Sequence, residues 1–169
     1  VARLSIQKRL DRLVHAISEM PGAHCVIAGE GTSRETLEQL IKDLNVGDRV
    51  HLLGERADVN DVLDALDVYA VTSNSEGMSN AMLEAMSRGL PVVSTDVSGA
   101  QDALAPDVSG RAAGLIAGFD VESLVSALER LRTDGALRDS LAREARERAL
   151  TWFSREKMLS DWEEFLSAR

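Results

Sequence analysis

The sequence predicts an α/β fold, with a Rossmann-like parallel sheet and helices on both faces. Short apolar runs alternate along the chain with longer amphipathic stretches, and strands that alternate with helices are typical of parallel sheets. Glycine, proline and asparagine separate the two kinds of segment, as at Pro21-Gly22, Asn45 and Gly89. The length of 169 residues suits one domain with its own core.

The first half of the chain opens with a helical pattern. Apolar residues recur at spacings of three and four from Ile6 to Ile17, which predicts an amphipathic helix. The apolar run around Cys25 predicts a buried strand, Thr32 or Ser33 can cap the next helix, and Asp58 can cap a short third one. The expected elements are helices at 6–20, 33–44 and 59–66 and strands at 24–28, 49–53 and 68–72.

The second half continues the alternation and then becomes wholly helical. Pro91 can stand at the first position of a strand, Gly114 weakens the following one, and Ser154 can cap the last helix. Trp152, Trp162 and Phe165 make that C-terminal region rich in aromatic residues, which either pack on the sheet or form an exposed apolar surface. The expected elements are helices at 79–88, 99–105, 121–132, 136–150 and 154–167 and strands at 91–95 and 112–117.

Composition and charge exclude several classes of protein. The net charge of −9 argues against a general nucleic-acid binder, which would usually carry a basic surface. No apolar run reaches the roughly 20 residues of a membrane-spanning helix. Cys25 is the only cysteine and lies in an apolar run, which indicates a core position and a reducing, cytoplasmic setting. The chain begins at Val1 without a methionine, so we expect residues 1–169 to be one domain of a longer protein.

The loop Ser73–Asn80 is the first candidate site. It leads from an expected strand into an expected helix, and ligands of parallel α/β sheets bind beyond the carboxyl ends of the strands. Gly77 allows the backbone to approach a ligand closely, while the N–H groups of Met78, Ser79 and Asn80 open the helix and favour an anion such as phosphate. The alternative is an ordinary capped turn between a strand and a helix.

Glu76 and Glu84 flank this turn. Eight residues correspond to roughly 12 Å along a helix, whereas paired carboxylates of a glycosidase stand about 5–9.5 Å apart. The two glutamates are therefore expected to contact different parts of one elongated ligand. Glu84 has apolar sequence neighbours, so its carboxylate is expected to need a partner or a ligand. Alternatively, Glu84 is an ordinary helix residue whose side chain is solvated.

The segment EGMSNAMLEAMSRGLPVVSTD resembles the signature of retaining glycosyltransferases of the GT-B fold, in family 4 (glycosyl transferases group 1). Glu76, seven residues and Glu84 match the family's paired glutamates, and Gly29-x-Gly31, Leu53-Gly54 and the run 89–96 extend the match. The resemblance covers essentially the whole chain and implies the C-terminal, donor-binding half of a two-domain enzyme. In the family the C-terminal helical region crosses back toward the N-terminal domain.

The resemblance also implies roles for individual residues. Arg3 and Lys8 match the basic pair that holds the donor diphosphate, although Ala2 replaces the usual glycine before the arginine. Glu76 matches the residue near the donor sugar, and Glu84 matches the ribose-binding one. The implied catalytic residues are Glu76, Arg3 and Lys8, and the implied donor-binding residues are Gly77, Met78, Ser79, Asn80, Glu84, Gly54 and Arg56.

The implied reaction moves a sugar from a nucleoside diphosphate (UDP or GDP) to an acceptor hydroxyl with retention. No metal is expected, because His15, His24 and His51 lack ligand spacing and cationic side chains can stabilise the leaving diphosphate. An acceptor saccharide or lipid-linked sugar would bind a missing N-terminal domain. The resemblance implies a role in polysaccharide biosynthesis, in which the full-length protein associates peripherally with the inner face of the membrane. The alternatives are a nucleotide-binding module without transfer activity and a sugar-nucleotide epimerase of similar shape.

Overall fold

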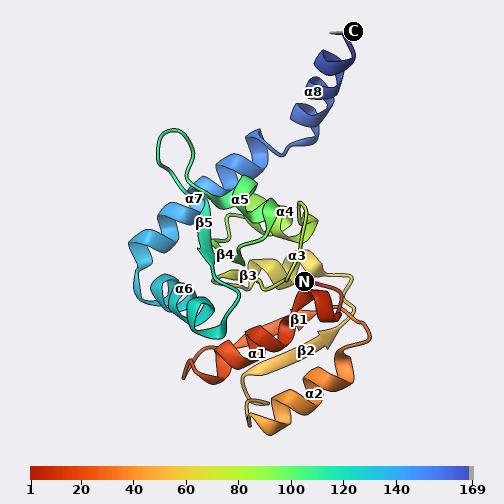
Figure 1. Cartoon of the computed structure of the whole chain (residues 1–169), viewed down its shortest axis with the longest axis vertical. Coiled ribbons are helices and arrows are strands. Elements are labelled where there is room, and N and C mark those ends of the chain that lie inside the picture. The colour runs from red at the N-terminus through yellow and green to blue at the C-terminus, as the bar shows by residue number, and fades with distance from the viewer. Residues whose placement is uncertain (168–169) are drawn as a thin grey trace.

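The computed structural model describes residues 1–167. Strands and helices alternate through most of the chain, and the C-terminal third is helical, as the sequence predicts (Figure 1). The strands are β1 (Cys25–Ala28), β2 (Val50–Gly54), β3 (Tyr69–Val71), β4 (Val92–Thr95) and β5 (Gly114–Ala117). The helices are the 3-10 helix η1 (Ile6–Lys8), α1 (Leu10–Ser18), α2 (Arg34–Asp43), α3 (Val59–Asp64), α4 (Asn80–Ser87), α5 (Ser98–Leu104), α6 (Val121–Thr133), α7 (Gly135–Thr151) and α8 (Arg155–Ser167).

All strand pairs are parallel, but within residues 1–167 they form two separate groups. β1 pairs with β2, and β4 lies between β3 and β5. The sequence predicts one sheet, and the structure shows that β1 and β3 do not pair with each other. The strands are nevertheless covered by the helices in the manner of one parallel layer.

Two hydrophobic cores lie on opposite faces of the strands, which confirms helices on both faces. Val93 belongs to the core formed with α1, α2 and α6, whereas its neighbour Val92 belongs to the core formed with α4, α5 and α7. Successive residues of a strand point to opposite faces, so burial of every residue of β4 requires cover on both sides. β4 is accordingly the central strand of its group.

The expected helix over 6–20 is broken at Arg9. This residue has φ 47° and ψ 45°, in the left-handed region that non-glycine residues seldom adopt. Ile6–Lys8 therefore form a separate 3-10 turn, and α1 begins at Leu10. The apolar spacing of three and four continues through the break, so periodicity alone does not reveal it.

Two of the expected N-cap residues make no capping hydrogen bond, and a third does. Ser33 and Asp58 occupy the N-cap positions of α2 and α3, but their side chains make no capping hydrogen bond. The Asp58 carboxylate instead accepts from Arg56 Nε at 2.7 Å. Ser154 Oγ does accept from the N–H of Lys157, at 3.1 Å, and so caps α8.

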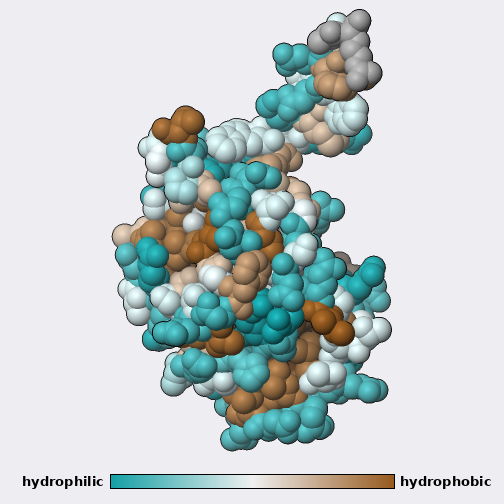
Figure 2. Space-filling view, in the orientation of Figure 1, coloured by the Kyte–Doolittle hydropathy of each residue, from teal (hydrophilic) through white to brown (hydrophobic). Residues whose placement is uncertain are grey.

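The C-terminal helix α8 projects from the body of the molecule (Figure 1). Its aromatic side chains are exposed, with Trp162 at 59% and Phe165 at 55% exposure, and none of its described residues is buried. Figure 2 shows apolar surface on this projection among hydrophilic groups. The aromatic side chains of α8 therefore form an exposed surface and do not pack on the sheet.

Candidate functional site

The loop between β3 and α4 is tied to the segment around η1. The N–H of Asn74 donates to Gln7 O at 3.0 Å, and Gln7 Nε2 donates to Ser75 O at 2.8 Å. Thr72 Oγ1 donates to Lys8 O at 2.8 Å. These bonds join segments more than 60 residues apart and hold the loop next to Lys8.

Lys8 and Glu76 form an ion pair across this junction. Lys8 Nζ lies 2.7 Å from Glu76 Oε1 and 2.8 Å from Oε2. The two side chains are only 24% and 15% exposed, so water screens the pair less than a surface pair. The structure therefore brings together two of the three residues expected to be catalytic.

The turn Gly77–Asn80 presents backbone donors to solvent. Gly77, Met78 and Asn80 are exposed, and Ser79 is the N-cap of α4, accepting from the N–H of Met82 at 3.4 Å. Within residues 1–167, no turn or loop hydrogen bond uses the N–H of Gly77, Met78 or Ser79. Unsatisfied N–H groups at a helix N-terminus attract anions.

Gly99 supports this turn from α5, a role that sequence reasoning missed. Its N–H donates to Glu76 O at 3.5 Å, and a Cβ added at Gly99 would lie 2.1 Å from Gly77 O. Only glycine allows this approach. The available signal is a glycine inside the expected helix 99–105, because such glycines usually have a packing reason.

Arg12 is a second supporting residue that the sequence pattern does not reveal. It is 3% exposed, and its guanidinium donates to Thr72 O at 2.6 Å and to Asn74 Oδ1 at 3.0 Å. It also lies 5.7 Å from the centroid of the Phe119 ring. From the other side, Thr95 Oγ1 donates to Ser73 O at 2.7 Å. The candidate loop is thus fixed from α1 and β4 together.

Glu84 lies on α4 with its side chain exposed to solvent. The expectation that its apolar neighbours force it to take a partner is wrong, because those neighbours turn inward while Glu84 does not. Burial raises the pKa of Tyr69, and the charges of Glu84 and Glu76 raise it further. Both carboxylates therefore act on the same tyrosine, whose hydroxyl donates to Val1 O at 3.0 Å.

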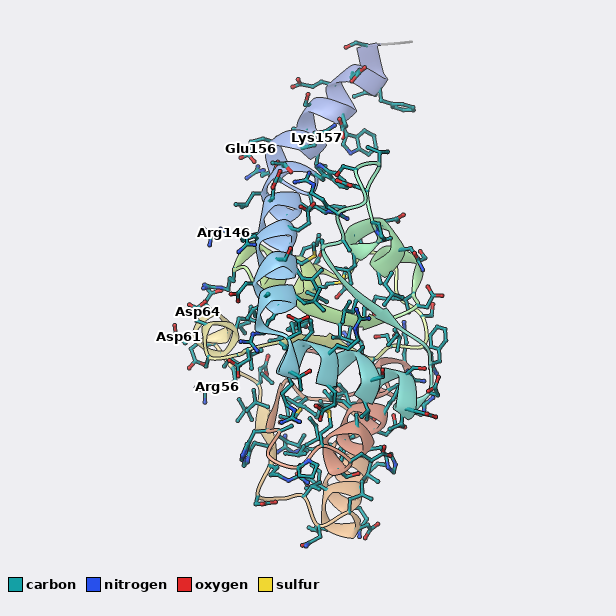
Figure 3. All side chains as sticks on the ribbon, turned by 90° about the vertical axis from the view of Figure 1, so that its left-hand side faces the viewer. Arg56, Asp61, Asp64, Arg146, Glu156 and Lys157 are labelled. Carbon is teal, nitrogen blue, oxygen red and sulfur yellow. The ribbon has the colours of Figure 1, made fainter. Side chains whose placement is uncertain are left out.

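The remaining expected residues are not joined to this cluster by direct bonds. Arg3 is exposed, and Gly54 ends β2 with φ 72° and accepts from Gly29 N at 2.7 Å. Arg56 projects outward beside α3 (Figure 3), where it pairs with Asp58. Among residues 1–167, no hydrogen bond or ion pair connects Arg3, Gly54 or Arg56 with the Lys8–Glu76 pair.

Neither a metal centre nor a membrane span is found in the part of the chain that the structure describes. Over residues 1–167, no three or more histidine, cysteine, aspartate or glutamate side chains are grouped to hold a metal ion. Over the same residues, no helix is both long and apolar enough to cross a bilayer. The site's polar chemistry comes from Lys8, Glu76 and backbone N–H groups.

The fold and this site are those of one protein family. The family model of the glycosyl transferases group 1 matches residues 1–148, and the chain belongs to that family, whose two-domain members have the GT-B fold.

Individual relatives agree with this assignment. The chain is 30% identical, over its whole length, to the lipopolysaccharide core biosynthesis glycosyltransferase LpsE of Rhizobium meliloti, of which it covers 49%. Anabaena HepE, solved in complex with UDP, superposes with a TM-score of 0.89 at 26% identity, covering 99% of this chain and 47% of HepE. WaaG, a glycosyltransferase involved in lipopolysaccharide biosynthesis, superposes over 86% of this chain and 40% of its own, with a TM-score of 0.74 at 28% identity. The chain thus spans about half the length of these proteins and matches the C-terminal half of the family's members.

Proposed function

We propose that this chain is the donor-binding half of a retaining glycosyltransferase that uses a nucleoside diphosphate sugar. The observation that carries the proposal is the Lys8–Glu76 pair beside the N–H groups of Gly77–Ser79, which no turn or loop hydrogen bond of residues 1–167 uses. A cation and free backbone donors at a helix N-terminus suit a diphosphate. The UDP bound to HepE supports the same ligand class.

In the proposed complex the diphosphate lies between Lys8 and the start of α4. Lys8 carries three donors and both oxygens of Glu76 already face it, so a bound phosphate would share the ammonium with Glu76. Arg3 is exposed and pairs with no described residue, which leaves it available as the second cation. Glu76 then faces the sugar, and Glu84 takes the ribose hydroxyls.

The proposed catalytic contribution is electrostatic. Negative charge develops on the diphosphate as the glycosidic bond breaks, and fixed donors aimed at developing charge often supply the largest part of a rate enhancement. Arg3, Lys8 and the dipole of α4 would stabilise that charge, so we propose no metal for this step. The backbone near Gly54 to Arg56 would meet the base.

The acceptor would bind a domain outside this chain. We propose a saccharide or lipid-linked sugar as acceptor, in line with the lipopolysaccharide enzymes LpsE and WaaG, and a full-length protein that works at the cytoplasmic face of the membrane. A nucleotide-binding module without transfer activity remains the second candidate, because the chain spans about half of its relatives. Transfer assays on the full-length protein separate the two.

Calorimetric titration with UDP and with GDP tests the donor site. We expect one of the two to bind, and Lys8→Met to weaken that binding by about tenfold or more, since a hydrogen bond to a charged group contributes roughly 1.5–3 kcal/mol. Lys42→Met is the matched control, because Lys42 is exposed on α2, outside the Lys8–Glu76 cluster. Absence of binding by both nucleotides at millimolar concentration would sink the proposed site. Equal losses in the two lysine variants would remove Lys8 from it.

A further inference from the structure

Arg9 has a backbone conformation that arginine seldom adopts, and it directly follows Lys8. Among residues 1–167, Arg9 and Asn45 are the non-glycine residues with positive φ, at 47° and 52°. The left-handed region is unfavourable for L-residues because Cβ crowds the backbone, and asparagine tolerates it better than most. Strained residues of this kind cluster at functional sites. The less tolerant of the two residues is the one beside the Lys8–Glu76 pair.

The left-handed residue releases two carbonyl groups from helical hydrogen bonding. In a continuous helix through this region, the carbonyls of Gln7 and Lys8 would accept from the N–H groups four residues further along the chain. Those N–H groups belong to Asp11 and Arg12. Arg12 N donates instead to Arg9 O, at 3.0 Å. The break at Arg9 thus leaves the two preceding carbonyls to partners outside α1.

The chain that follows β3 binds both released carbonyls. Asn74 N donates to Gln7 O at 3.0 Å, and Thr72 Oγ1 donates to Lys8 O at 2.8 Å. The same loop carries Glu76, whose two carboxylate oxygens lie 2.7 and 2.8 Å from Lys8 Nζ. A helix that closed over Gln7 and Lys8 would remove two of the hydrogen bonds that hold this loop next to the ammonium group.

The side chain of Arg9 contacts both α1 and the same loop. Arg9 Nε donates to Asp11 Oδ1 at 3.0 Å, and Nη2 donates to Asp11 Oδ2 at 2.9 Å. Arg9 Nη1 lies 3.4 Å from Asn74 Oδ1. The Arg9 and Asp11 side chains are 34% and 40% exposed, and ion pairs at such exposure contribute little. The backbone of Arg9 is therefore a stronger candidate for a role than its guanidinium.

We propose that Arg9 is a positioning residue for Lys8 and that it acts through its left-handed backbone. The break keeps the carbonyls of Gln7 and Lys8 available to the loop after β3, so Glu76 stays paired with Lys8 beside the turn Gly77–Asn80. The consequence for nucleotide binding rests on the proposed donor site. The attachment of the loop to the segment around Lys8 does not.

Arg9→Ala and Arg9→Gly separate the backbone from the side chain. Both variants lack the guanidinium, but alanine favours a continuous right-handed helix, whereas glycine adopts the left-handed region without steric cost. We expect the amide of Asn74, which donates to Gln7 O, to exchange about tenfold faster in Arg9→Ala and at the parent rate in Arg9→Gly. Calorimetry should show UDP or GDP bound about tenfold more weakly by Arg9→Ala and with parent affinity by Arg9→Gly.

Asn45→Ala is the matched control, because Asn45 has the same backbone conformation at the end of α2. It should lower the midpoint of thermal unfolding, since alanine is strained at positive φ, and leave the exchange of Asn74 and the nucleotide affinity unchanged. Arg9→Asn is a second check on the backbone, because asparagine tolerates the left-handed region. It should behave as Arg9→Gly does.

Four results would overturn the proposal. Parent exchange of Asn74 in Arg9→Ala would show that the break does not hold the loop. Equal acceleration in the alanine, glycine and asparagine variants of Arg9 would assign the effect to the guanidinium. Equal acceleration in Asn45→Ala would show a general loss of stability. Parent nucleotide affinity in Arg9→Ala, despite faster exchange of Asn74, would show that Lys8 needs no such positioning.

Failure of the donor site itself gives a different pattern. If the parent protein binds neither UDP nor GDP while the exchange of Asn74 follows the expected order, the attachment of the loop through Arg9 is supported and only the proposed donor site fails.

Discussion

Replacing Arg12 with methionine removes the guanidinium that fastens the loop after β3 while keeping a long apolar stem. Arg12 is 3% exposed, so the substitution acts inside the protein. Its guanidinium donates to Thr72 O at 2.6 Å and to Asn74 Oδ1 at 3.0 Å. That loop carries Glu76, so the change should affect both stability and the candidate site.

The expected cost follows from these contacts. Each hydrogen bond from a charged donor contributes roughly 1.5–3 kcal/mol, and the contact with the Phe119 ring adds roughly 0.5–1 kcal/mol. Burial lowers the pKa of Arg12, which means that the folded protein bears a desolvation cost for this charge, and methionine relieves that cost. We therefore expect a net loss of about 2–4 kcal/mol.

Thermal unfolding followed by circular dichroism measures this loss. For a domain of this size, 1 kcal/mol corresponds to roughly 2–4 °C, so Arg12→Met should lower the midpoint by roughly 5–15 °C. Arg34→Met is the matched control, because the Arg34 guanidinium also donates to two partners, the carboxylates of Glu30 and Glu38, but its side chain is 33% exposed. Exposed ion pairs contribute about 0–1 kcal/mol, so the control should shift little.

The binding of UDP or GDP gives the second readout. Below its unfolding temperature, Arg12→Met should bind the nucleotide about tenfold more weakly, since loosening of the loop misplaces Glu76 and the turn that follows it. Arg34→Met should bind as the parent protein does. A midpoint for Arg12→Met within about 1 °C of the control would refute the reasoning that a buried guanidinium holds this loop.

Three further outcomes are expected. Glu84→Ala should weaken nucleoside diphosphate binding more than Glu76→Ala does, because only Glu84 is assigned to the ribose; calorimetry showing equal losses would count against this division. Gly99→Ala should lower the unfolding midpoint and the nucleotide affinity together, since its Cβ would lie 2.1 Å from Gly77 O; unchanged values of both would mean that the turn can move at no cost. Burial raises the pKa of Cys25 to about 12. Iodoacetamide should therefore alkylate Cys25 at pH 8.5 about a thousandfold more slowly than a free cysteine. Half-labelling of the folded protein within minutes would contradict this burial.

Much of the fold follows from local patterns. The strand over 68–72 and the helix over 79–88 are recovered within two residues as β3 and α4, because apolar spacing and turn residues are properties of neighbouring positions. The break at Arg9 escapes the same reasoning, since a left-handed residue leaves the apolar spacing unchanged.

Part of the candidate site can likewise be predicted from the sequence, and part of it cannot. The turn from Gly77 to Asn80 is recognisable from its residues, but the exposure of Glu84 is not, because it depends on which face of α4 packs inward. The support from Arg12 and Gly99 depends on partners that are distant in the chain.

The sequence by itself determined the alternation of strands and helices, the family resemblance and the position of the glycine turn, since each is written in adjacent residues. Only the tertiary structure decided that Lys8 meets Glu76, 68 positions away, and that Arg12 reaches Thr72, 60 positions away. It also decided that, within residues 1–167, β1 and β3 do not pair with each other. Contacts of this kind arise when helices and strands pack into one body, and their geometry depends on the whole core rather than on any local run of residues.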